Sequence, residues 1–345
     1  MNSIIGKKEG TASVVFLTLP IIVFDYSTKS LENSGSGSII NFTLCFLLSF
    51  VMLYFIKYSF VNLNENKDGK DIFEKIINSV FLIYIIFLSF NNYSISLASL
   101  LSITENSGFD NQIVGLFLVL VSLICSFGGV ESLTRTAYMC FGVFLFTIFV
   151  MCLLSFSGWD YDNIAPVFGN NTRESFLKFN GIRVFSPLMC LYFLKNHFRK
   201  NKEGIQALKS IIFIVFSISL FIIAVCILSV PYPMGKLYDF SLQGIFSIAK
   251  SGLFFHRFEI ILVLGVTVIS VVSSALGIYI SSASISKLTN FNDKKAWCII
   301  LAFLFYITNL NFKIKMPLEF ASVALYLLLL VKAFKNYSSV KKVKI

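Results

Sequence analysis

The sequence has 345 residues, of which 56% are hydrophobic and only 14% are charged, and its formal net charge is +11. A mean hydropathy of +0.80 lies far outside the range of a soluble globular domain, so the composition predicts an integral membrane protein. The positive charge could suggest nucleic-acid binding. The basic residues are concentrated in particular loops between apolar runs, however, and this distribution instead predicts how the protein is oriented in the membrane.

Ten apolar runs of suitable length follow one another along the chain, since a helix needs about 20 residues to cross a bilayer core of ~30 Å. We therefore expect an all-α integral membrane protein that forms a single polytopic domain over residues 1–345. The expected spans cover approximately residues 11–25, 39–60, 76–102, 112–129, 137–156, 177–194, 208–230, 258–283, 296–311 and 317–335.

The charges of the connections predict the orientation. Basic residues follow spans six and eight and close the chain, whereas the connections after spans three and five carry Glu105, Asp110, Asp160 and Asp162. This alternation follows the positive-inside rule and places both termini in the cytoplasm. No connection exceeds roughly 25 residues, too few for a separate soluble domain. We expect the function to lie within the bundle or on its short loops.

Helix-breaking residues occur in spans one and six. Span one contains Pro20, and span six contains Gly181 and Pro187. Proline removes a backbone donor and clashes with the preceding turn. Interrupted segments in corresponding members of two five-helix halves point to an inverted-repeat transporter with a midplane site. Ordinary proline kinks would give the same pattern, and only the spacing, without residue similarity between the halves, supports a repeat.

The segment "GGVESLTRTAYM", residues 128–139, places two charges between apolar runs. Glu131 and Arg135 are four residues apart, so on a helix they share a face and can pair. We interpret them as an interfacial ion pair at the cytoplasmic end of span four, in preference to a direct role in ligand binding.

The same segment resembles the Gly-x-Glu-x-x-x-Arg motif of the spore-germination permease family, the B subunits of GerA-type nutrient germinant receptors. The matching residues are Gly129, Glu131 and Arg135. Residues 4–24, 160–179 and 230–263 are similar to other stretches of that family, in the same order. The last stretch fits the family's Tyr-Pro and Phe-x-Arg-x-Glu elements with Tyr232, Pro233, Phe255, Arg257 and Glu259.

Two departures from the family pattern are visible. Members often carry a proline just after span one, where this chain has "DYSTKS", and a glutamate after the Phe-Ser of span six, where this chain has Pro187. The resemblance implies two inverted five-helix repeats of the amino acid/polyamine/organocation (APC/LeuT-like) type, with helices 1 and 6 interrupted. It also implies a subunit of the spore inner membrane that binds a small nutrient, with an amino acid expected, and that works with A and C subunits.

A nutrient site of this type would use helix ends and freed carbonyls of spans one and six to hold the ligand's charges. Arg183 is either a carboxylate partner for the ligand or an anchor that snorkels to the outer leaflet. The serine stripe Ser270, Ser273 and Ser274 indicates close helix packing. The expected ligand contacts are Phe16, Thr18, Leu19, Pro20, Arg183, Phe185, Ser186 and Pro187.

Three alternatives remain open. The first is an active amino acid permease that uses the same site. The second is a polytopic glycan polymerase or acyltransferase, for which the best candidate cluster is the outside loop with Asp160, Asp162, Arg173 and Glu174. The third is an assembly subunit whose site has degenerated. We expect no enzymatic activity, cofactor, metal or nucleic-acid partner, because no phosphate loop, Cys-x-x-Cys or His-Glu-x-x-His motif is present. The expected partners are a nutrient, membrane lipid, and A and C subunits.

Overall fold

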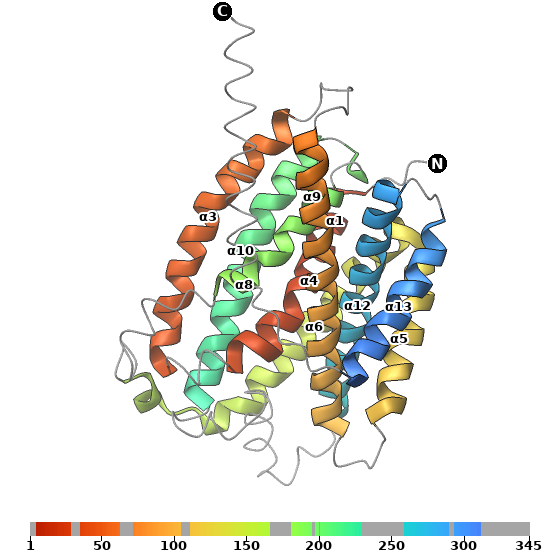
Figure 1. Ribbon diagram of the computed structural model, residues 1–345. Helices are drawn as coiled ribbons and strands as arrows, with labels where there is room; N and C mark the ends of the chain where they lie inside the picture. The colour runs from red at the N-terminus through yellow and green to blue at the C-terminus, as the bar shows by residue number, and fades with distance from the viewer. Residues whose placement is uncertain are drawn as a thin grey trace, which may run out of the picture.

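The computed structural model describes residues 5–28, 35–62, 72–104, 111–165, 181–194, 197–199, 201–229, 259–289 and 293–311. This part of the chain is almost entirely helical, and Figure 1 shows its helices gathered into one bundle. Its elements are α1 (Lys7–Pro20), η1 (Ile21–Tyr26), η2 (Gly35–Gly37), α3 (Ser38–Asn62), α4 (Ile72–Thr104), α5 (Asn111–Phe127), α6 (Gly129–Ser155), η4 (Phe156–Gly158), η5 (Tyr161–Ile164), α8 (Ile182–Phe185), η6 (Ser186–Met189), α9 (Cys190–Leu194), α10 (Asn201–Ser229), α12 (Glu259–Thr289) and α13 (Lys294–Asn311).

Nine of the ten expected spans coincide with these elements, and the tenth, residues 317–335, lies outside the described residues. The expected start of span five at residue 137 is wrong, because α6 begins at Gly129. Gly129 has a φ of 81°, a left-handed conformation that favours glycine. The chain therefore reverses immediately after α5, and Glu131 and Arg135 belong to the start of span five rather than to the end of span four.

The outer helices present apolar side chains around the bundle. Phe117 and Ile124 on α5, Phe149 on α6 and Phe303 on α13 are all more than half exposed. Five helices in the described part of the chain are long and apolar enough to cross a membrane. Large apolar side chains on an outer surface suit contact with lipid rather than with water. The protein is therefore a multi-pass membrane protein.

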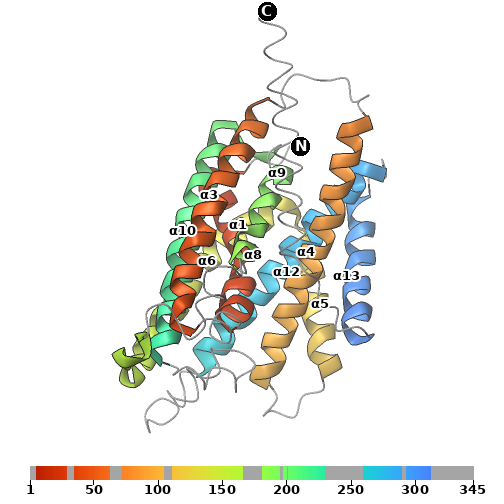
Figure 2. The ribbon, with the colours of Figure 1, turned by 60° about the vertical axis from the view of Figure 1, so that its left-hand side comes forward.

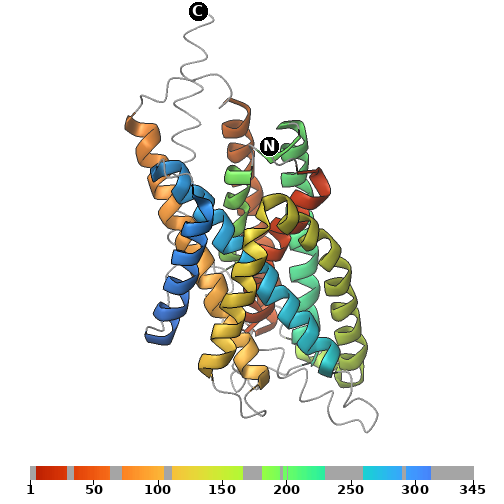
Figure 3. The ribbon, with the colours of Figure 1, turned by 90° about the vertical axis from the view of Figure 1, so that its right-hand side faces the viewer.

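α1 and η1 form the buried centre of the bundle, because every residue from Gly10 to Phe24 lies inside it. α1 contacts α6, α10 and α12. α3 and α10 stand side by side at one edge, and α5 and α13 stand together at the other (Figures 1 and 2). α12 runs obliquely across the bundle (Figure 3) and touches α4, α5, α6 and α13.

α4 and α12 pack closely through small polar residues. The Ser281 hydroxyl donates to Ser89 Oγ at 2.9 Å, and the hydroxyls of Ser96 and Ser273 are 3.4 Å apart. A Cβ added at Gly277 would lie 3.0 Å from the Cβ of Ser89, so the two backbones are near their closest approach. Small residues of α12, including Ser273 of the predicted stripe, therefore allow close packing against α4.

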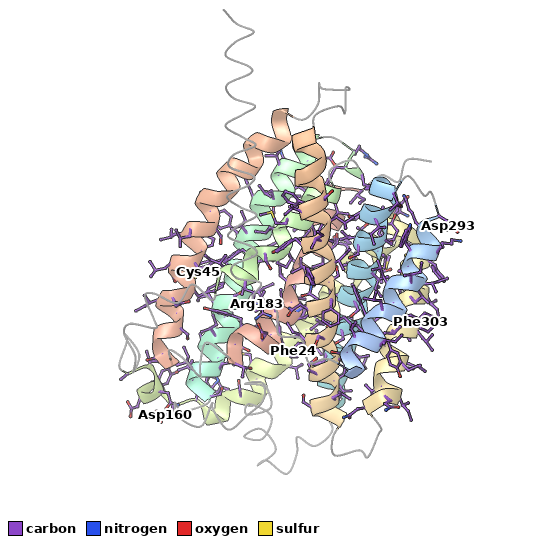
Figure 4. All side chains as sticks on the ribbon, in the orientation of Figure 1. Phe24, Cys45, Asp160, Arg183, Asp293 and Phe303 are labelled. Atoms are coloured by element: carbon purple, nitrogen blue, oxygen red, sulfur yellow. The ribbon has the colours of Figure 1, made fainter. Side chains whose placement is uncertain are left out.

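Two backbone hydrogen bonds show which segments lie at each end of α10. The Ile5 N–H donates to the His197 carbonyl just before α10, whereas the Asp160 N–H donates to the Leu228 carbonyl near its end. The start of α1 and the connection that carries Asp160 thus lie at opposite ends of α10. Figure 4 likewise places Asp160 and Asp293 at opposite ends of the bundle.

Candidate functional site

The interruption in span one is a change of helical winding at Pro20. Proline has no N–H, so it cannot donate to the carbonyl four residues before it. The Ile21 N–H bonds to the Thr18 carbonyl, and the chain continues as a π-helix from Ile21 to Tyr26. The Leu17 carbonyl, which an unbroken α-helix would bond to Ile21, instead accepts a hydrogen bond of 2.8 Å from Asn92 Nδ2 of α4. A side chain from span three thus stabilises the irregular winding of span one.

Span six is divided into the three short segments α8, η6 and α9. Pro187 lies in the first turn of the 3₁₀ segment η6, and the Ser186 hydroxyl donates to the Arg183 carbonyl at 2.6 Å. A Cβ added at Gly181 would lie 2.9 Å from the Cβ of Cys45 on α3. Glycine therefore allows span six to approach α3 closely where its irregular part begins.

Arg183 joins three spans through its guanidinium group. Its Nη1 lies 2.8 Å from Asp25 Oδ2 on η1, and its Nη2 donates to Asn91 Oδ1 on α4 at 2.8 Å. Arg183 is only 8% exposed. Figure 4 shows it inside the bundle, between Cys45 on α3 and Phe24 on η1. The interpretation of Arg183 as a snorkelling anchor is therefore wrong, because its guanidinium pairs with the Asp25 carboxylate inside the bundle and does not extend to the membrane surface.

Asp25, Asn91 and Arg183 form a polar junction between spans one, three and six, and Asn92 follows Asn91 on α4. Three buried side-chain atoms of these four residues have no hydrogen-bond partner in the described part of the chain: Arg183 Nε, Asn91 Nδ2 and Asn92 Oδ1. Each unsatisfied buried polar atom costs about 1–3 kcal/mol, and such atoms are few in native proteins. Arg183 Nε and Asn91 Nδ2 are therefore two buried donors without an acceptor at this junction, which makes it the candidate site for a small polar ligand.

All eight ligand contacts expected from the sequence are buried. Phe16 packs against Phe144 of α6 with ring centroids 6.3 Å apart, and Phe185 stacks on Phe42 of α3 at 5.6 Å. The Thr18 hydroxyl donates to its own helix, at the Val15 carbonyl. α1 contacts η6 and α9, and η1 contacts α8, so the structure does bring the two interrupted spans together.

Sequence reasoning missed Asp25, Asn91 and Asn92. Two signals were present, because Asp25 closes span one with a full negative charge and the consecutive asparagines stand within the apolar span three. Ionisable and polar side chains inside a membrane span usually face the interior and pair there. That rule would have made the three residues candidates, although it could not have named their partners.

The ion pair expected from the family motif is present. Arg135 Nη2 donates to Glu131 Oε1 at 2.6 Å, and Arg135 Nε lies 3.8 Å from Glu9 Oε1. The other carboxylate oxygen of Glu9 accepts from the Gly6 N–H at 2.9 Å. The motif therefore links the start of α6 to the start of α1. The remaining motif residues Tyr232, Pro233, Phe255 and Arg257 lie outside the described residues, and Glu259 begins α12.

The cluster considered for an enzyme is described only in part. Asp160 and Asp162 are exposed on the η5 connection, where Asp160 Oδ1 accepts from the Asp162 N–H at 3.0 Å. This is the geometry of a turn cap. Arg173 and Glu174 lie outside the described residues. Within the described part, no three His, Cys, Asp or Glu residues come together to hold a metal ion.

Irregular spans one and six meet around a largely buried charge pair in a helical membrane bundle, which is the helix arrangement of LeuT-like folds. The fold is similar to that of a Na⁺-coupled sialic acid symporter solved in a substrate-bound outward-open state. The TM-score is 0.68 and the identity 11%, with 96% of this chain and 80% of that chain covered. The expected all-α, LeuT-like fold is thereby confirmed.

Residues 36–316 match the family described as spore germination protein, and the chain belongs to that family. The membership inferred from the short motifs is confirmed. A comparison with curated proteins gives no match. The family is one of spore germination permeases, which supports a permease-like role in germination.

Proposed function

We propose that this chain is the nutrient-binding subunit of a germinant receptor. On this proposal it binds a small nutrient, an amino acid, at the polar junction and triggers germination together with A and C subunits. It lies in the inner membrane of the spore, with both termini in the cytoplasm. The observation that carries the proposal is the buried pair of Asp25 and Arg183 together with two unpaired donors at the same junction, Arg183 Nε and Asn91 Nδ2.

The junction matches the chemistry of an amino acid. A zwitterion carries one carboxylate and one ammonium group. The carboxylate is opposite in charge to Arg183, and the ammonium group is opposite in charge to Asp25. An entering amino acid can therefore place its carboxylate on the guanidinium and its ammonium on the Asp25 carboxylate, so that neither buried charge is left alone. Asn91, whose Oδ1 already accepts from Arg183, supplies its Nδ2 as a further donor for the ligand carboxylate. A neutral sugar carries no charge with which to replace either partner of the Asp25–Arg183 ion pair.

Signalling follows from the position of the pair. Asp25 lies on η1 and Arg183 on α8, so a ligand inserted between them changes the distance between spans one and six. A ligand shifts a conformational equilibrium only by its differential affinity for the two states. Subunits that contact the bundle would sense the shifted population, and net transport of the nutrient is not required.

The test is nutrient-triggered release of dipicolinic acid from spores of the source organism. Four strains are compared: wild type, a deletion, Asp25→Asn, and the control Asp160→Asn, which removes an exposed carboxylate outside the junction. The abundance of each variant is measured by immunoblot. The deletion and Asp25→Asn are expected to lose the response to one class of amino acid, while Asp160→Asn retains it. Unchanged release from the deletion strain for every amino acid, sugar and nucleoside would contradict the proposal.

An active amino acid permease is the second candidate, favoured by the fold that the chain shares with a Na⁺-coupled symporter. It predicts substrate counterflow in vesicles that contain the isolated chain alone. The receptor proposal instead predicts binding without counterflow. Two results together would favour the permease over the receptor proposal. The isolated chain would show counterflow that Asp25→Asn abolishes, and deletion of the gene would leave germination intact.

A further inference from the structure

A second candidate site lies away from the polar junction, between the first turns of α1 and the neighbouring parts of α6 and α10. A pocket of about 250 Å³ opens there. α1 contributes Lys7, Lys8 and Val15 to its lining, α6 contributes Tyr138, and α10 contributes Ile214. We refer to it as the α1 pocket.

The lining of the α1 pocket changes from charged to apolar along the helix. Lys7 and Lys8 are exposed at the start of α1, whereas Val15 is fully buried. Val15 follows Lys7 by eight positions, which is about 12 Å along the helix at 1.5 Å per residue. Thr11 lies between these ends, and Phe141 and Ile214 extend the apolar part. An occupant that fits has an anionic head and an apolar tail.

The two lysines carry positive charge that the described residues do not neutralise. Neither Lys7 nor Lys8 forms an ion pair with a described residue, and the adjacent carboxylate of Glu9 is engaged by Arg135 and the Gly6 N–H. Basic pockets between membrane helices bind anionic lipid headgroups, and each lysine near an anionic surface contributes about 1 kcal/mol.

The surroundings of the α1 pocket point towards lipid. Tyr138, which lines the pocket, is 46% exposed, and its neighbour Met139 is 77% exposed. On α10, Phe213 is 56% exposed next to the lining residue Ile214. Large apolar side chains of this exposure form the surface that faces the bilayer. The pocket therefore lies beside the lipid-facing surface, where a phospholipid can reach it from the membrane.

We propose that the α1 pocket binds an anionic phospholipid, with its phosphate on Lys7 and Lys8 and the upper part of an acyl chain against Val15, Phe141 and Ile214. A soluble phosphate shares the headgroup chemistry but leaves the apolar part of the pocket unfilled. This site is separate from the polar junction and does not depend on the nutrient-receptor proposal.

The charge arm of the test uses the purified full chain in nanodiscs of phosphatidylcholine with increasing phosphatidylglycerol, and measures bound lipid by native mass spectrometry. Lys7→Gln/Lys8→Gln is expected to lower the preference for phosphatidylglycerol about thirtyfold, since two lysines are removed. Lys294→Gln/Lys295→Gln is the matched control, because it removes two exposed lysines from the start of α13, outside the pocket. Retained preference in the first variant, or equal loss in both, would overturn the proposal.

The second part of the test keeps Lys7 and Lys8 and fills the apolar part of the α1 pocket with a larger side chain. Ile214→Trp is expected to lower phosphatidylglycerol binding at least tenfold, whereas Phe213→Trp, on the adjacent exposed residue outside the pocket, leaves binding unchanged. Inorganic phosphate is added as a competitor in the same assay. If phosphate displaces the lipid at equal concentration and Ile214→Trp has no effect, the pocket binds soluble phosphate and the lipid proposal is wrong.

Discussion

At the residue scale, the pair of Asp25 and Arg183 has two separable consequences, one for stability and one for binding. Removing one partner of a buried ion pair leaves an uncompensated charge and costs about 3–5 kcal/mol, whereas replacing both partners by apolar residues is often neutral. The side chains are 14% and 9% exposed, so solvent screens this pair little. A variant that lacks both charges can therefore be stable and still unable to bind a zwitterion.

We predict that Arg183→Met and Asp25→Leu each lower the free energy of unfolding by about 3–5 kcal/mol. The double variant should regain most of that loss. The measurement is thermal denaturation of the detergent-solubilised protein. Nutrient-triggered release should remain absent in the double variant despite its recovered stability. A double variant whose losses simply add would mean that the two charges do not interact.

Asn92 provides a second prediction, because its amide replaces the backbone donor that the winding at Pro20 removes. Asn92→Leu leaves the Leu17 carbonyl without this donor and should cost about 1–3 kcal/mol. Pro20→Ala restores a backbone N–H for the Phe16 carbonyl and removes the proline ring, which allows the Ile21 N–H to bond to the Leu17 carbonyl in a regular α-helix. Asn92→Leu should then cost less in the Pro20→Ala background than in wild type, as measured by denaturation of the four proteins.

An equal cost of Asn92→Leu in both backgrounds would show that Asn92 does not stabilise the irregular winding.

The partners of Asn92 and Arg183 could not be predicted from the sequence, because spacing reveals only pairs on one helix, such as Glu131 and Arg135. Which face of span three meets span one depends on the rotation of both helices, and this is decided by packing across the whole bundle. Polar residues within a span identify candidate site residues, but they do not show which of these residues contact one another.

At the element scale, hydropathy predicted the helices well and their polar ends poorly. The start of α6 was placed eight residues too late, since Glu131 and Arg135 lower the local hydropathy although they occupy the first turns of the helix. The interruptions of spans one and six were predicted from Pro20 and Pro187. The winding that results was not, because proline removes one hydrogen bond and the surrounding helices determine how the chain compensates.

Two glycines on packed and open helix faces give a matched prediction. A Cβ at Gly265 on α12 would lie 2.9 Å from the Cβ of Thr147 on α6, whereas a Cβ at Gly142 on α6 would meet no atom within 4 Å. Gly265→Ala should therefore destabilise the protein by about 1–3 kcal/mol through overpacking. Gly142→Ala should stabilise it by about 0.5–1 kcal/mol through helix propensity.

Denaturation of both alanine variants under the same conditions measures the difference. Similar stabilities would show that α12 and α6 do not approach as closely as the structure has them. The comparison isolates packing because both substitutions add the same methyl group to a regular helix. Only the surroundings of that group differ.

At the scale of the whole molecule, α1 and η1 connect the features described above. The start of α1 lines the α1 pocket and is linked to α6 through Glu9 and Arg135, its last turn changes winding at Pro20, and η1 carries Asp25. Because this segment is buried along most of its length, it cannot move without repacking α6, α10 and α12. A ligand at Asp25 and a lipid at Lys7 would thus bias the same element.

The last prediction decides whether nutrient recognition belongs to this chain or to a partner subunit. A ligand that binds only the folded state stabilises it by RT ln(1 + [L]/Kd), about 2.7 kcal/mol at one hundred times Kd. We therefore expect one class of amino acid to raise the Tm of the purified chain by several degrees. The stable double variant Asp25→Leu/Arg183→Met should show no rise, and Lys294→Gln/Lys295→Gln should respond like wild type. A rise that requires the A and C subunits, with none in the chain alone, would make this chain an assembly subunit and place the nutrient site elsewhere in the receptor.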